Sequence, residues 1–599
     1  MTFNETGQKD LQTCYFVCKS WYSVAIPLNW ESINLPNYKV ALVKSHLNGF
    51  DHYQYFKYGH LITTLTIDGP EIIKGYMGHK FSKPELLMLL NQLPNLSNID
   101  LNYSDYVTEY LEALLYADLQ CINEINIGDN EHFNCLDLHF LTCYKSRNSI
   151  SRMSLSYDKS TIVFNSQQIN ILNSLTQFNQ LEWLHFKNSL DIDLTPYHVQ
   201  NVCPELKHLI FFSNFPISER AILRLLGTNS EMNRNFSTSL ISLELQLPSL
   251  SATYTRYLVD YFPSQLNKIT IRIPCQGIFG WINTVGMGLA LQLMEKIGKI
   301  KETFIFFEEN SEVQVNDETD MTKYFRLLNA FRGSRQGHCT ANFSEEGSTC
   351  SIFRYDLSGN LSITYDSRSD DFNSSNFRLN LPDKTSSIIG HEIFDTLNLS
   401  CKNLSHDIVR QNLNYFFLNC PTLQSFDFRS SLGVEFEYSY IRYKHKEDLL
   451  SSNLTNRDIN FLEVGNLYPA QTFFDMMTTH LRDIEAVSLG ALDWGHSHND
   501  SVMDLTCFKK LKTFAYTSQI SLLKKNDNKN DDFVLLKYTN GEELYYYIDK
   551  EKNKNPQAEY IKNPTMPRLT IVSDTSVSFD FCESKPFYAD PSYITLFQQ

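Results

Sequence analysis

The chain is built on one short apolar pattern that recurs along most of its length. In each copy, three large apolar residues are spaced three and then two positions apart, as in Leu206, Leu209 and Phe211. Alternate residues of an extended strand point to opposite sides. The last two apolar residues of each copy therefore face a core, and the residue between them faces outward. The copies begin at Ile62, Leu96, Ile122, Ile150, Leu181, Leu206, Leu240, Leu266, Phe394, Leu423, Ile459, Ile484 and Leu511.

The spacing of the copies predicts a repeat of strand, turn and helix. Within each block, successive copies start about 25 to 36 residues apart, by subtraction of those positions. A single such unit cannot bury its apolar face, so the units must stack. The connecting segments 83–93, 105–117 and 218–226 carry apolar residues at helical spacing, and Gly227 is the expected C-cap of the last one.

The pattern resembles the leucine-rich repeat, whose regular period of roughly 20–29 residues is somewhat shorter. Asn214 stands where that family places its turn asparagine. The resemblance implies an α/β leucine-rich-repeat solenoid of the ribonuclease-inhibitor-like kind, with irregular repeats.

Composition limits the partners and the compartment. The chain has 599 residues and a net charge of −16, which argues against nucleic acid or an anionic membrane as the main partner. Its 13 cysteines form no C-x-x-C pair, and we expect those in repeat positions, such as Cys121 and Cys203, to be buried thiols. We expect no signal peptide and no membrane span, because the first residues are polar and the longest uncharged run, 278–294, is too short. A cytoplasmic or nuclear protein is therefore predicted.

Residues 10–35 differ from the repeats. Apolar residues follow helical spacing up to Trp21, and Pro27 ends the helical stretch. A helical cap that shields the first repeat is one interpretation, since solenoids need capping units.

The same stretch resembles the second half of an F-box, in which Asp-Leu precedes Val-Cys-(Lys/Arg)-x-Trp, a small residue, Pro and Trp. The matching residues are Asp10, Leu11, Val17, Cys18, Lys19, Trp21, Pro27 and Trp30. The resemblance implies contact with the adaptor subunit of an SCF ubiquitin ligase, and through it with a cullin. The expected adaptor-binding residues are Leu11, Cys14, Val17, Cys18, Trp21, Pro27 and Trp30. The first F-box helix has no counterpart in residues 1–9, which predicts either an incomplete gene product or weakened adaptor binding.

The predicted organisation has six parts. They are a partial F-box-like helical segment (1–35), a linker (36–60), a first repeat block (61–277), irregular repeats with loop and hairpin insertions (278–390), a second repeat block (391–520) and a C-terminal hairpin and cap (521–599). Within 278–390 we expect a helix at 288–296, a strand at 304–307 and a hairpin of 350–355 with 361–365. A domain boundary in this part is the alternative. A second hairpin is expected around Asn540 and Gly541, since both residues tolerate positive φ.

The outward residues of four successive copies predict a binding surface. They are Trp183, His185, Lys187, His208, Ile210, Phe212, Ser242, Glu244, Gln246, Lys268, Thr270 and Arg272. Aromatic residues and arginine are favoured binding anchors. The residues expected to contact a protein substrate are Trp183, His185, Lys187, His208, Phe212, Glu244, Lys268 and Arg272. An acidic or phosphorylated segment would complement the basic members of this set.

Catalytic signals are lacking in the sequence. The dense His/Asp stretch 493–500 lies in one short loop without a partner at a defined distance, so no metal or other cofactor is predicted. No glycine-rich phosphate loop, G-x-S-x-G or H-E-x-x-H occurs. The F-box resemblance implies a non-enzymatic substrate-recognition subunit of an SCF-type ubiquitin ligase. The alternative is a protein-interaction scaffold not linked to ubiquitin.

Overall fold

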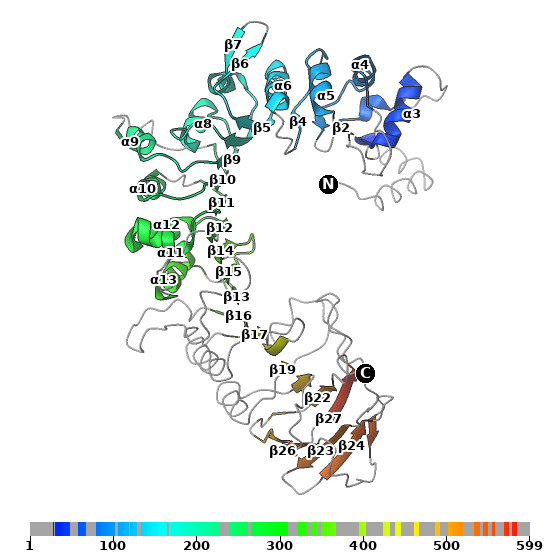
Figure 1. The fold of residues 1–599 in the computed structure, drawn as a ribbon, viewed down its shortest axis with the longest axis vertical. Coiled ribbons are helices and arrows are strands. Elements are labelled where there is room, and N and C mark those ends of the chain that lie inside the picture. Colours follow the sequence, from blue (N-terminus) through cyan, green and yellow to red (C-terminus); the bar gives the residue numbers. More distant parts are fainter. Residues whose placement is uncertain are drawn as a thin grey trace. The chain divides into compact units, whose positions relative to one another are not determined.

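The chain forms two compact units. The computed structural model describes residues 28, 30–47, 58–67, 80–101, 106–118, 120–128, 133–164, 167–227, 239–261, 265–309, 321–333, 335, 337–344, 349–366, 394–402, 423, 425–431, 438–444, 461–465, 486–490, 501–506, 508, 510–511, 513–518, 532–538, 543–548, 554–556, 568–573 and 578–583. The first unit is Met1–Pro274 with Thr284–Leu289, and the second is Cys275–Asn283 with Ala290–Gln599. Both are mixed α/β, as predicted (Figure 1). Among the helices in these ranges, none has the length and apolar character needed to cross a bilayer.

The main strands of the first unit are parallel and neighbour one another in chain order. Strands β1 (Ser32–Leu35), β2 (Thr64–Ile67), β3 (Asn98–Asp100) and β4 (Glu124–Asn126) form one ladder. Strands β5 (Arg152–Tyr157), β8 (Trp183–Asn188), β9 (His208–Ser213), β10 (Ser242–Gln246) and β11 (Lys268–Ile273) form the next. The backbone N–H groups of Ser151 and Arg152 donate to the carbonyl of Asn123, at 3.0 and 3.1 Å, and so join the two ladders. Each copy of the apolar pattern in this unit lies on or beside one of these strands.

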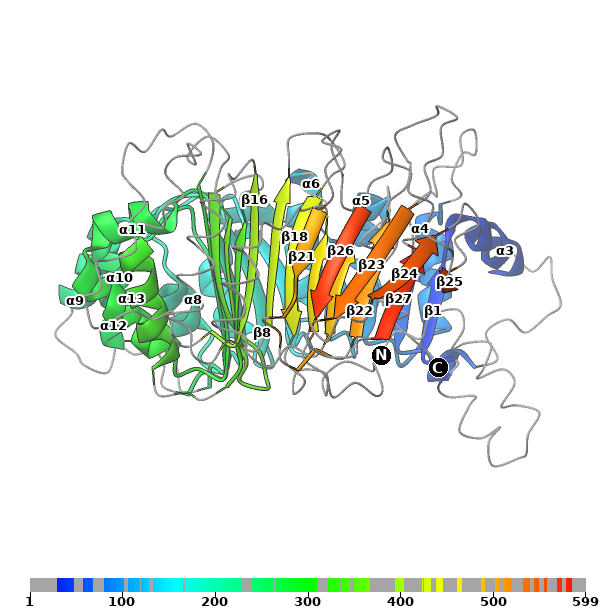
Figure 2. The same cartoon turned by 90° about the horizontal axis from the view of Figure 1, so that it is seen from below.

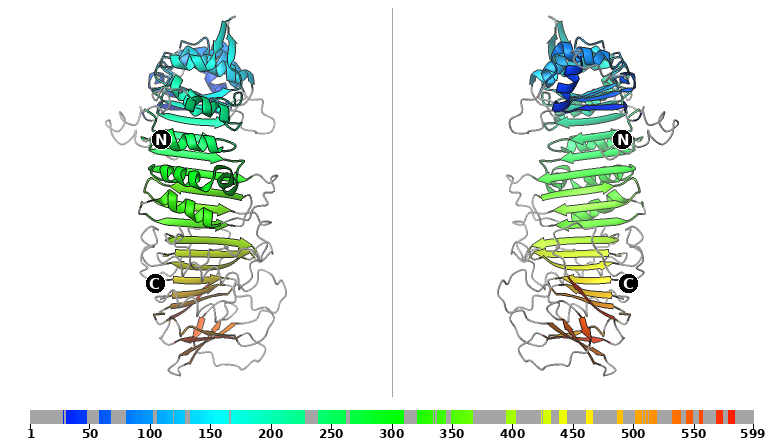
Figure 3. Two further views of the ribbon diagram at one scale, coloured as in Figure 1. Left: turned by 90° about the vertical axis from the view of Figure 1, so that its left-hand side faces the viewer. Right: turned by 90° about the vertical axis from the view of Figure 1, so that its right-hand side faces the viewer.

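Helices connect the strands and lie along one face of them (Figures 1 and 3). They are α3 (Asn37–Leu47), α4 (Lys83–Asn91), α5 (Val107–Leu114), α6 (Phe133–Lys145), α7 (Ile171–Ser174), α8 (Pro196–Val202), α9 (Glu219–Gly227) and α10 (Ala252–Tyr261), with short 3-10 turns at Gly59–Leu61 and Leu175–Gln177. The predicted helices 83–93, 105–117 and 218–226 are confirmed as α4, α5 and α9. A hairpin of β6 (Thr161–Phe164) and β7 (Gln167–Asn170) was not predicted.

The core of the first unit lies between the strands and these helices. Leu184 and Phe186 on β8, and Leu209 and Phe211 on β9, are at most 1% exposed. Phe186 and Phe211 are register partners, and their rings stack with centroids 6.0 Å apart. The alternation of buried and outward residues predicted from the pattern is thus confirmed in these strands.

The N-terminal segment differs from the expectation at its end. The residues of β1 belong to the segment 1–35 that was expected to be helical, yet they form a parallel strand. Ile33 pairs with Leu65, and Leu35, which is fully buried, pairs with Ile67. Alternating apolar residues extend the sheet by one strand here, because their period of two matches a strand and not a helix. The predicted linker 36–60 contributes α3, whose Val40 and Val43 are fully buried.

The turn that ends each central strand is made one residue earlier than predicted. Asn188 at the end of β8 is fully buried, and its side chain donates to the carbonyl of Asp191 at 2.6 Å and accepts from the Asp191 N–H at 3.1 Å. Its register partner Ser213 donates to the carbonyl of Phe215 at 2.9 Å. The prediction for Asn214 is therefore wrong, because this residue is exposed and its side chain donates to Ser189. A period of two puts positions 188 and 213, and not 214, on the core side.

The cysteines follow the prediction only in part. Cys135, Cys143, Cys203 and Cys339 are buried and unpaired, as expected of structural thiols. Cys121 is exposed, which contradicts its predicted burial. It directly precedes the first apolar residue of its copy, at a position that faces solvent.

The second unit contains parallel strands interrupted by antiparallel insertions. Helices α11 (Ile278–Val285) and α12 (Met287–Ile297) each include residues of both units, and α13 (Met321–Arg332) belongs to the second. The strand order is β12 (Glu302–Glu309), β14 (Thr349–Tyr355), β15 (Leu361–Asp366), β13 (Cys339–Ser344), β16 (Thr396–Lys402), β17 (Ser425–Ser431), β18 (Tyr438–Lys444), β19 (Phe461–Gly465), β20 (Ala486–Gly490), β22 (Thr513–Ser518) and β27 (Ser578–Glu583). Strands β14 and β18 are antiparallel to both of their neighbours.

A smaller sheet also belongs to the second unit. Its order is β21 (Ser501–Asp504), β26 (Arg568–Ser573), β23 (Asp532–Tyr538), β24 (Glu543–Ile548) and β25 (Lys554–Pro556), and Figure 2 shows β26, β23 and β24 side by side in orange. The predicted helix 288–296, the strand 304–307 and both hairpins are confirmed as α12, β12, the β14–β15 pair and the β23–β24 pair. The segments 406–418 and 471–480, whose sequences also predict helices, lie outside the described residues.

Two buried tyrosines of the helical layer differ in whether their hydroxyl groups have a hydrogen-bond partner, and this difference predicts opposite effects on stability. The hydroxyl of Tyr254 on α10 has no hydrogen-bond partner although the residue is 1% exposed, whereas the Tyr110 hydroxyl on α5 accepts from the Phe81 N–H at 3.3 Å. An unsatisfied buried hydroxyl costs about 1–3 kcal/mol. We therefore expect Tyr254→Phe to leave the unfolding free energy unchanged or higher, and Tyr110→Phe to lower it by about 1 kcal/mol. Urea unfolding followed by circular dichroism measures both, and equal losses would contradict the assignment.

The buried imidazole of His139 predicts a loss of stability in acid. His139 on α6 is 2% exposed, and its Nε2 lies 2.8 Å from the carbonyl of Ile125. Burial lowers its pKa, despite the opposing effect of that hydrogen bond. The unfolded chain binds a proton near a pKa of about 6.5, so below that pH the unfolded state binds more protons and stability falls.

The variant His139→Gln retains a donor for the Ile125 carbonyl but does not titrate. We expect its unfolding free energy to fall less than that of the wild type between about pH 7 and pH 5. His60→Gln, a change at an exposed histidine, is the control and should retain the wild-type slope. A wild-type slope in His139→Gln would show that other groups cause the acid sensitivity.

Candidate binding face of the first unit

The outward residues of β5 and β8–β11 lie in three straight rows because the five strands share one register. We call these residues together the outward face. The amino-end row is Arg152, Trp183, His208, Ser242 and Lys268; the middle row is Ser154, His185, Ile210, Glu244 and Thr270; the carboxyl-end row is Ser156, Lys187, Phe212, Gln246 and Arg272.

The structure thus brings together all the residues that the sequence placed on this surface. Except for Thr270, which is 6% exposed, they are half-buried or exposed, while the residues between them in each strand are buried. Their shared face follows from the structure, and their role in binding stays a prediction.

Arg152 was missed by the sequence analysis and extends the face by one strand. The copy that begins at Ile150 has the same spacing as its neighbours, so this residue was available from the pattern. Its guanidinium group lies 5.1 Å from the centre of the Trp183 ring. On the carboxyl-end row, the ammonium group of Lys187 lies 5.6 Å from the Phe212 ring. Two cations therefore lie over aromatic rings of the neighbouring strand.

Acidic residues partly neutralise the face. Arg272 forms an ion pair with Glu244 at 3.2 Å, and Arg152 forms one with Glu124 on β4 at 3.4 Å. Arg272 and Arg152 are about half exposed in these pairs, with side-chain exposures of 45% and 53%. Exposed pairs of this kind contribute about 0–1 kcal/mol, so they do not hold the cations away from a ligand. Glu244 was expected to contact substrate and is instead engaged with Arg272 in this structure.

His208 reports the electrostatic environment of the amino-end row. Burial lowers its pKa, and the nearby cations Arg152, Lys207 and Lys268 lower it further, against the opposing effect of Glu182. In the middle row, the hydroxyl of Ser154 lies 3.3 Å from Nδ1 of His185. A neutral His208 surrounded by cations would gain a proton if an anion were placed beside it.

Most of the expected adaptor-binding residues lie outside the described part of the chain. They are Leu11, Cys14, Val17, Cys18, Trp21 and Pro27. Trp30 is described and is half-buried, with its ring centroid 5.6 Å from that of Tyr58. Its contact with an adaptor stays a prediction.

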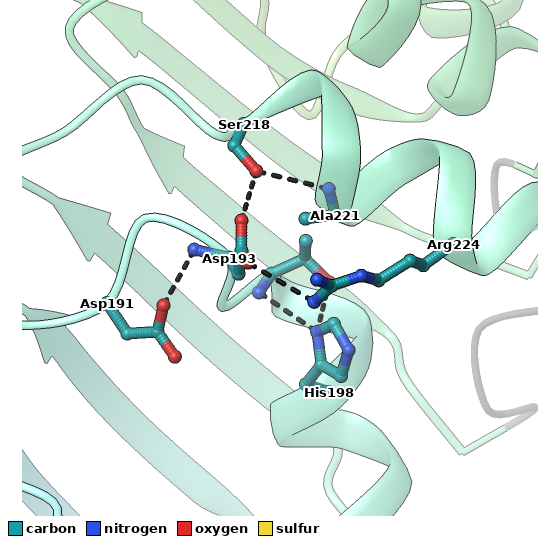
Figure 4. Close-up of polar contacts among 7 residues, drawn as sticks. Asp191, Asp193, His198, Ser218, Ala221 and Arg224 are labelled. Carbon is teal, nitrogen blue, oxygen red and sulfur yellow. Dashed lines mark hydrogen bonds and ion pairs between the residues drawn. The ribbon is translucent and has the colours of Figure 1, made fainter.

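A polar cluster joins the loop after β8 to helix α9 (Figure 4). The Ser218 hydroxyl donates to Oδ1 of Asp193, and Nη1 of Arg224 lies 3.3 Å from Oδ2 of the same carboxylate. Ser218 also accepts from the Ala221 N–H at 3.1 Å, so it caps the amino end of α9. The cluster therefore links the loop between β8 and α8 to the start of α9, which follows β9.

This cluster contains Ser, His and Asp but is not arranged for nucleophilic catalysis. Nδ1 of His198 accepts from the Thr195 N–H at 3.1 Å, as part of the cap of α8. The Ser218 hydroxyl donates to the Asp193 carboxylate and not to the His198 imidazole, so serine and histidine are not paired as in a Ser-His-Asp triad. Burial lowers the pKa of His198, although Asp191 and Asp193 oppose this shift.

The described ranges contain no group of three or more His, Cys, Asp or Glu residues placed to hold a metal ion. The His/Asp stretch 493–500 lies outside those ranges. Comparison with models of known protein families finds none that matches the chain, and comparison with curated proteins finds no match either.

The cap of α9 predicts a measurable loss of stability. In Ser218→Ala, the Ala221 N–H and the Asp193 carboxylate each lose a partner, and we expect the unfolding free energy to fall by about 1 kcal/mol. Ser160→Ala, which changes an exposed serine outside this cluster, should have no effect beyond error. Urea unfolding measures both variants, and an unchanged Ser218→Ala would show that the cap does not stabilise the unit.

Proposed function

We propose that this chain is the substrate-recognition subunit of an SCF-type ubiquitin ligase, built as a leucine-rich-repeat solenoid. In this proposal the N-terminal F-box-like segment docks the adaptor subunit, and through it a cullin, in the cytoplasm or nucleus. The outward face holds a target protein for ubiquitin transfer by other subunits. The chain supplies proximity and carries no catalytic group or cofactor of its own.

The observation that carries the proposal is the outward face itself. Aromatic and basic side chains from four of the five strands share one surface on a chain whose net charge is −16. Trp, Tyr and Arg are enriched among the residues that dominate protein–protein binding energy. A surface of this composition favours a protein partner with acidic side chains.

The ladder of parallel strands supports the solenoid. Successive copies pair in register, such as Leu184 with Leu209 and Leu462 with Val487. In the first unit, a helix follows nearly every strand on the same side (Figure 1). Units that each contact their sequence neighbours are the defining feature of such architectures.

Retention by the SCF adaptor tests the proposal. When the full chain is co-expressed with the adaptor, we expect the two to co-purify and the double variant Val17→Asp, Trp21→Ala to be lost, because both changes remove apolar contacts from the F-box-like segment. The measurement is pull-down through a tag on the adaptor.

The matched control is Val163→Asp with Tyr116→Ala. It removes the same kinds of side chain from positions that are 67% and 71% exposed on the repeats, and it should be retained. Failure of the chain to co-purify even after a first F-box helix is added upstream would overturn the link to ubiquitin and leave a scaffold that binds proteins through its outward face.

A further inference from the structure

The basic residues of the amino-end row lie on alternate strands. Arg152, His208 and Lys268 lie on β5, β9 and β11, and Trp183 and Ser242 lie between them on β8 and β10. Neighbouring strands are about 4.8 Å apart, so successive cationic positions are spaced by about 10 Å. A ligand that meets all three must present its anions at that interval.

This interval matches the repeat of a polyproline II helix. That conformation has three residues per turn and rises about 3.1 Å per residue, so every third side chain lies on one face at about 9 Å. An extended β-strand offers same-face side chains at about 7, 13 and 20 Å, so from the position of Arg152 it can reach that of Lys268 but not that of His208. An α-helix offers same-face positions seven residues apart at about 10.5 Å, and over two intervals it overruns the row by about 2 Å.

Trp183 favours proline between the anions. Its half-buried ring lies in the row between Arg152 and His208, and the guanidinium of Arg152 is 5.1 Å from its centre. Aromatic surfaces of this kind bind proline-rich segments, which already hold the polyproline II conformation and so lose little entropy on binding.

We propose that the amino-end row binds an acidic, proline-rich segment in the polyproline II conformation, which crosses strands β5 to β11 with a carboxylate at every third residue. The inference rests on the proposed function, since it names the class of target that the outward face recognises.

Carboxylates fit this row better than phosphates. Within the row, the neutral residues Trp183 and Ser242 separate each basic residue from the next. A phosphate group takes up two or three charge-assisted hydrogen bonds and is best held by clustered arginines. A single carboxylate needs only one such partner.

Binding of this segment should be coupled to proton uptake by His208. The charged groups around its imidazole are Arg152, Lys207 and Lys268, which lower its pKa together with burial, and Glu182, which opposes them. A carboxylate placed beside the ring favours the protonated form. Affinity should therefore increase as the pH falls from about 7.5 to 6.

The test uses labelled peptides and the full chain. The main probe is three consecutive Glu-Pro-Pro triplets, and its matched control contains the same residues with all glutamates together at one end. We expect the spaced peptide to bind at least about fivefold tighter than the clustered one, because only its carboxylates reach separate cations. Fluorescence polarisation at low ionic strength measures both affinities.

Variants of the chain locate the site. Lys268→Glu should weaken binding of the spaced peptide by about tenfold or more, because it places like charges together. Lys299→Glu, the same change at an exposed lysine of the second unit, should leave binding unchanged. His208→Gln should bind the spaced peptide with little dependence on pH.

Each result decides the proposal. Equal affinity for the two peptides, no binding at millimolar concentration, or equal effects of the two lysine changes would overturn it. If the peptide bound only when phosphoserine replaced glutamate, the ligand group would be a phosphate and not a carboxylate, and the proposal would also be overturned. Retention by the adaptor is measured separately, so a failed peptide test with a retained chain refutes this inference while the proposed function stands.

Discussion

The shared register of the parallel strands is the constraint on which the first unit depends. Each central strand is hydrogen-bonded on both sides, and its apolar residues meet those of its neighbours at the same level. A slip of one residue would turn Leu209 and Phe211 outward and their polar neighbours into the core, because strand side chains alternate with a period of two. Phe186 and Phe211 stack their rings across the two strands, and a slip in register would separate them. The same register that closes the core also aligns the outward rows.

The connections after the strands keep that register by satisfying buried polar groups. Asn188 and Ser213 bond the backbone of the turns that follow them. One carboxylate, Asp193, then joins the next connection through Ser218 and Arg224 (Figure 4). The first N–H groups of a helix have no partner within the helix, so Thr195 at the start of α8 and Ser218 at the start of α9 have a structural role. This explains why serine, histidine and aspartate meet here without the geometry of an active site.

The outward face is rich in basic residues, whereas the chain as a whole has a net charge of −16. Several of its cations are shared with glutamates of neighbouring strands, and two lie over aromatic rings. Such a surface is already partly desolvated and partly neutralised, which lowers the cost of covering it with a partner. Burial lowers the pKa of His208, and the cations Arg152, Lys207 and Lys268 add to this shift.

The sequence by itself determined the repeat strands β2–β5 and β8–β11, their outward residues, and the connecting helices α4, α5 and α9 of the first unit. That was possible because a local pattern with a period of two, repeated at similar intervals, leaves one way for every copy to bury its apolar residues. The sequence analysis missed Arg152 only because it took the outward residues of four copies of the pattern and left out the copy that begins at Ile150. Tertiary structure alone decided the rest. Strand β1 joins the sheet because β2 offers it a paired edge, and Ser213, not Asn214, bonds the turn after β9 because the core lies on the Ser213 side of the strand. The antiparallel strands β14 and β18 and the electrostatic state of His208 depend on neighbours distant in the chain, and no local spacing encodes such neighbours.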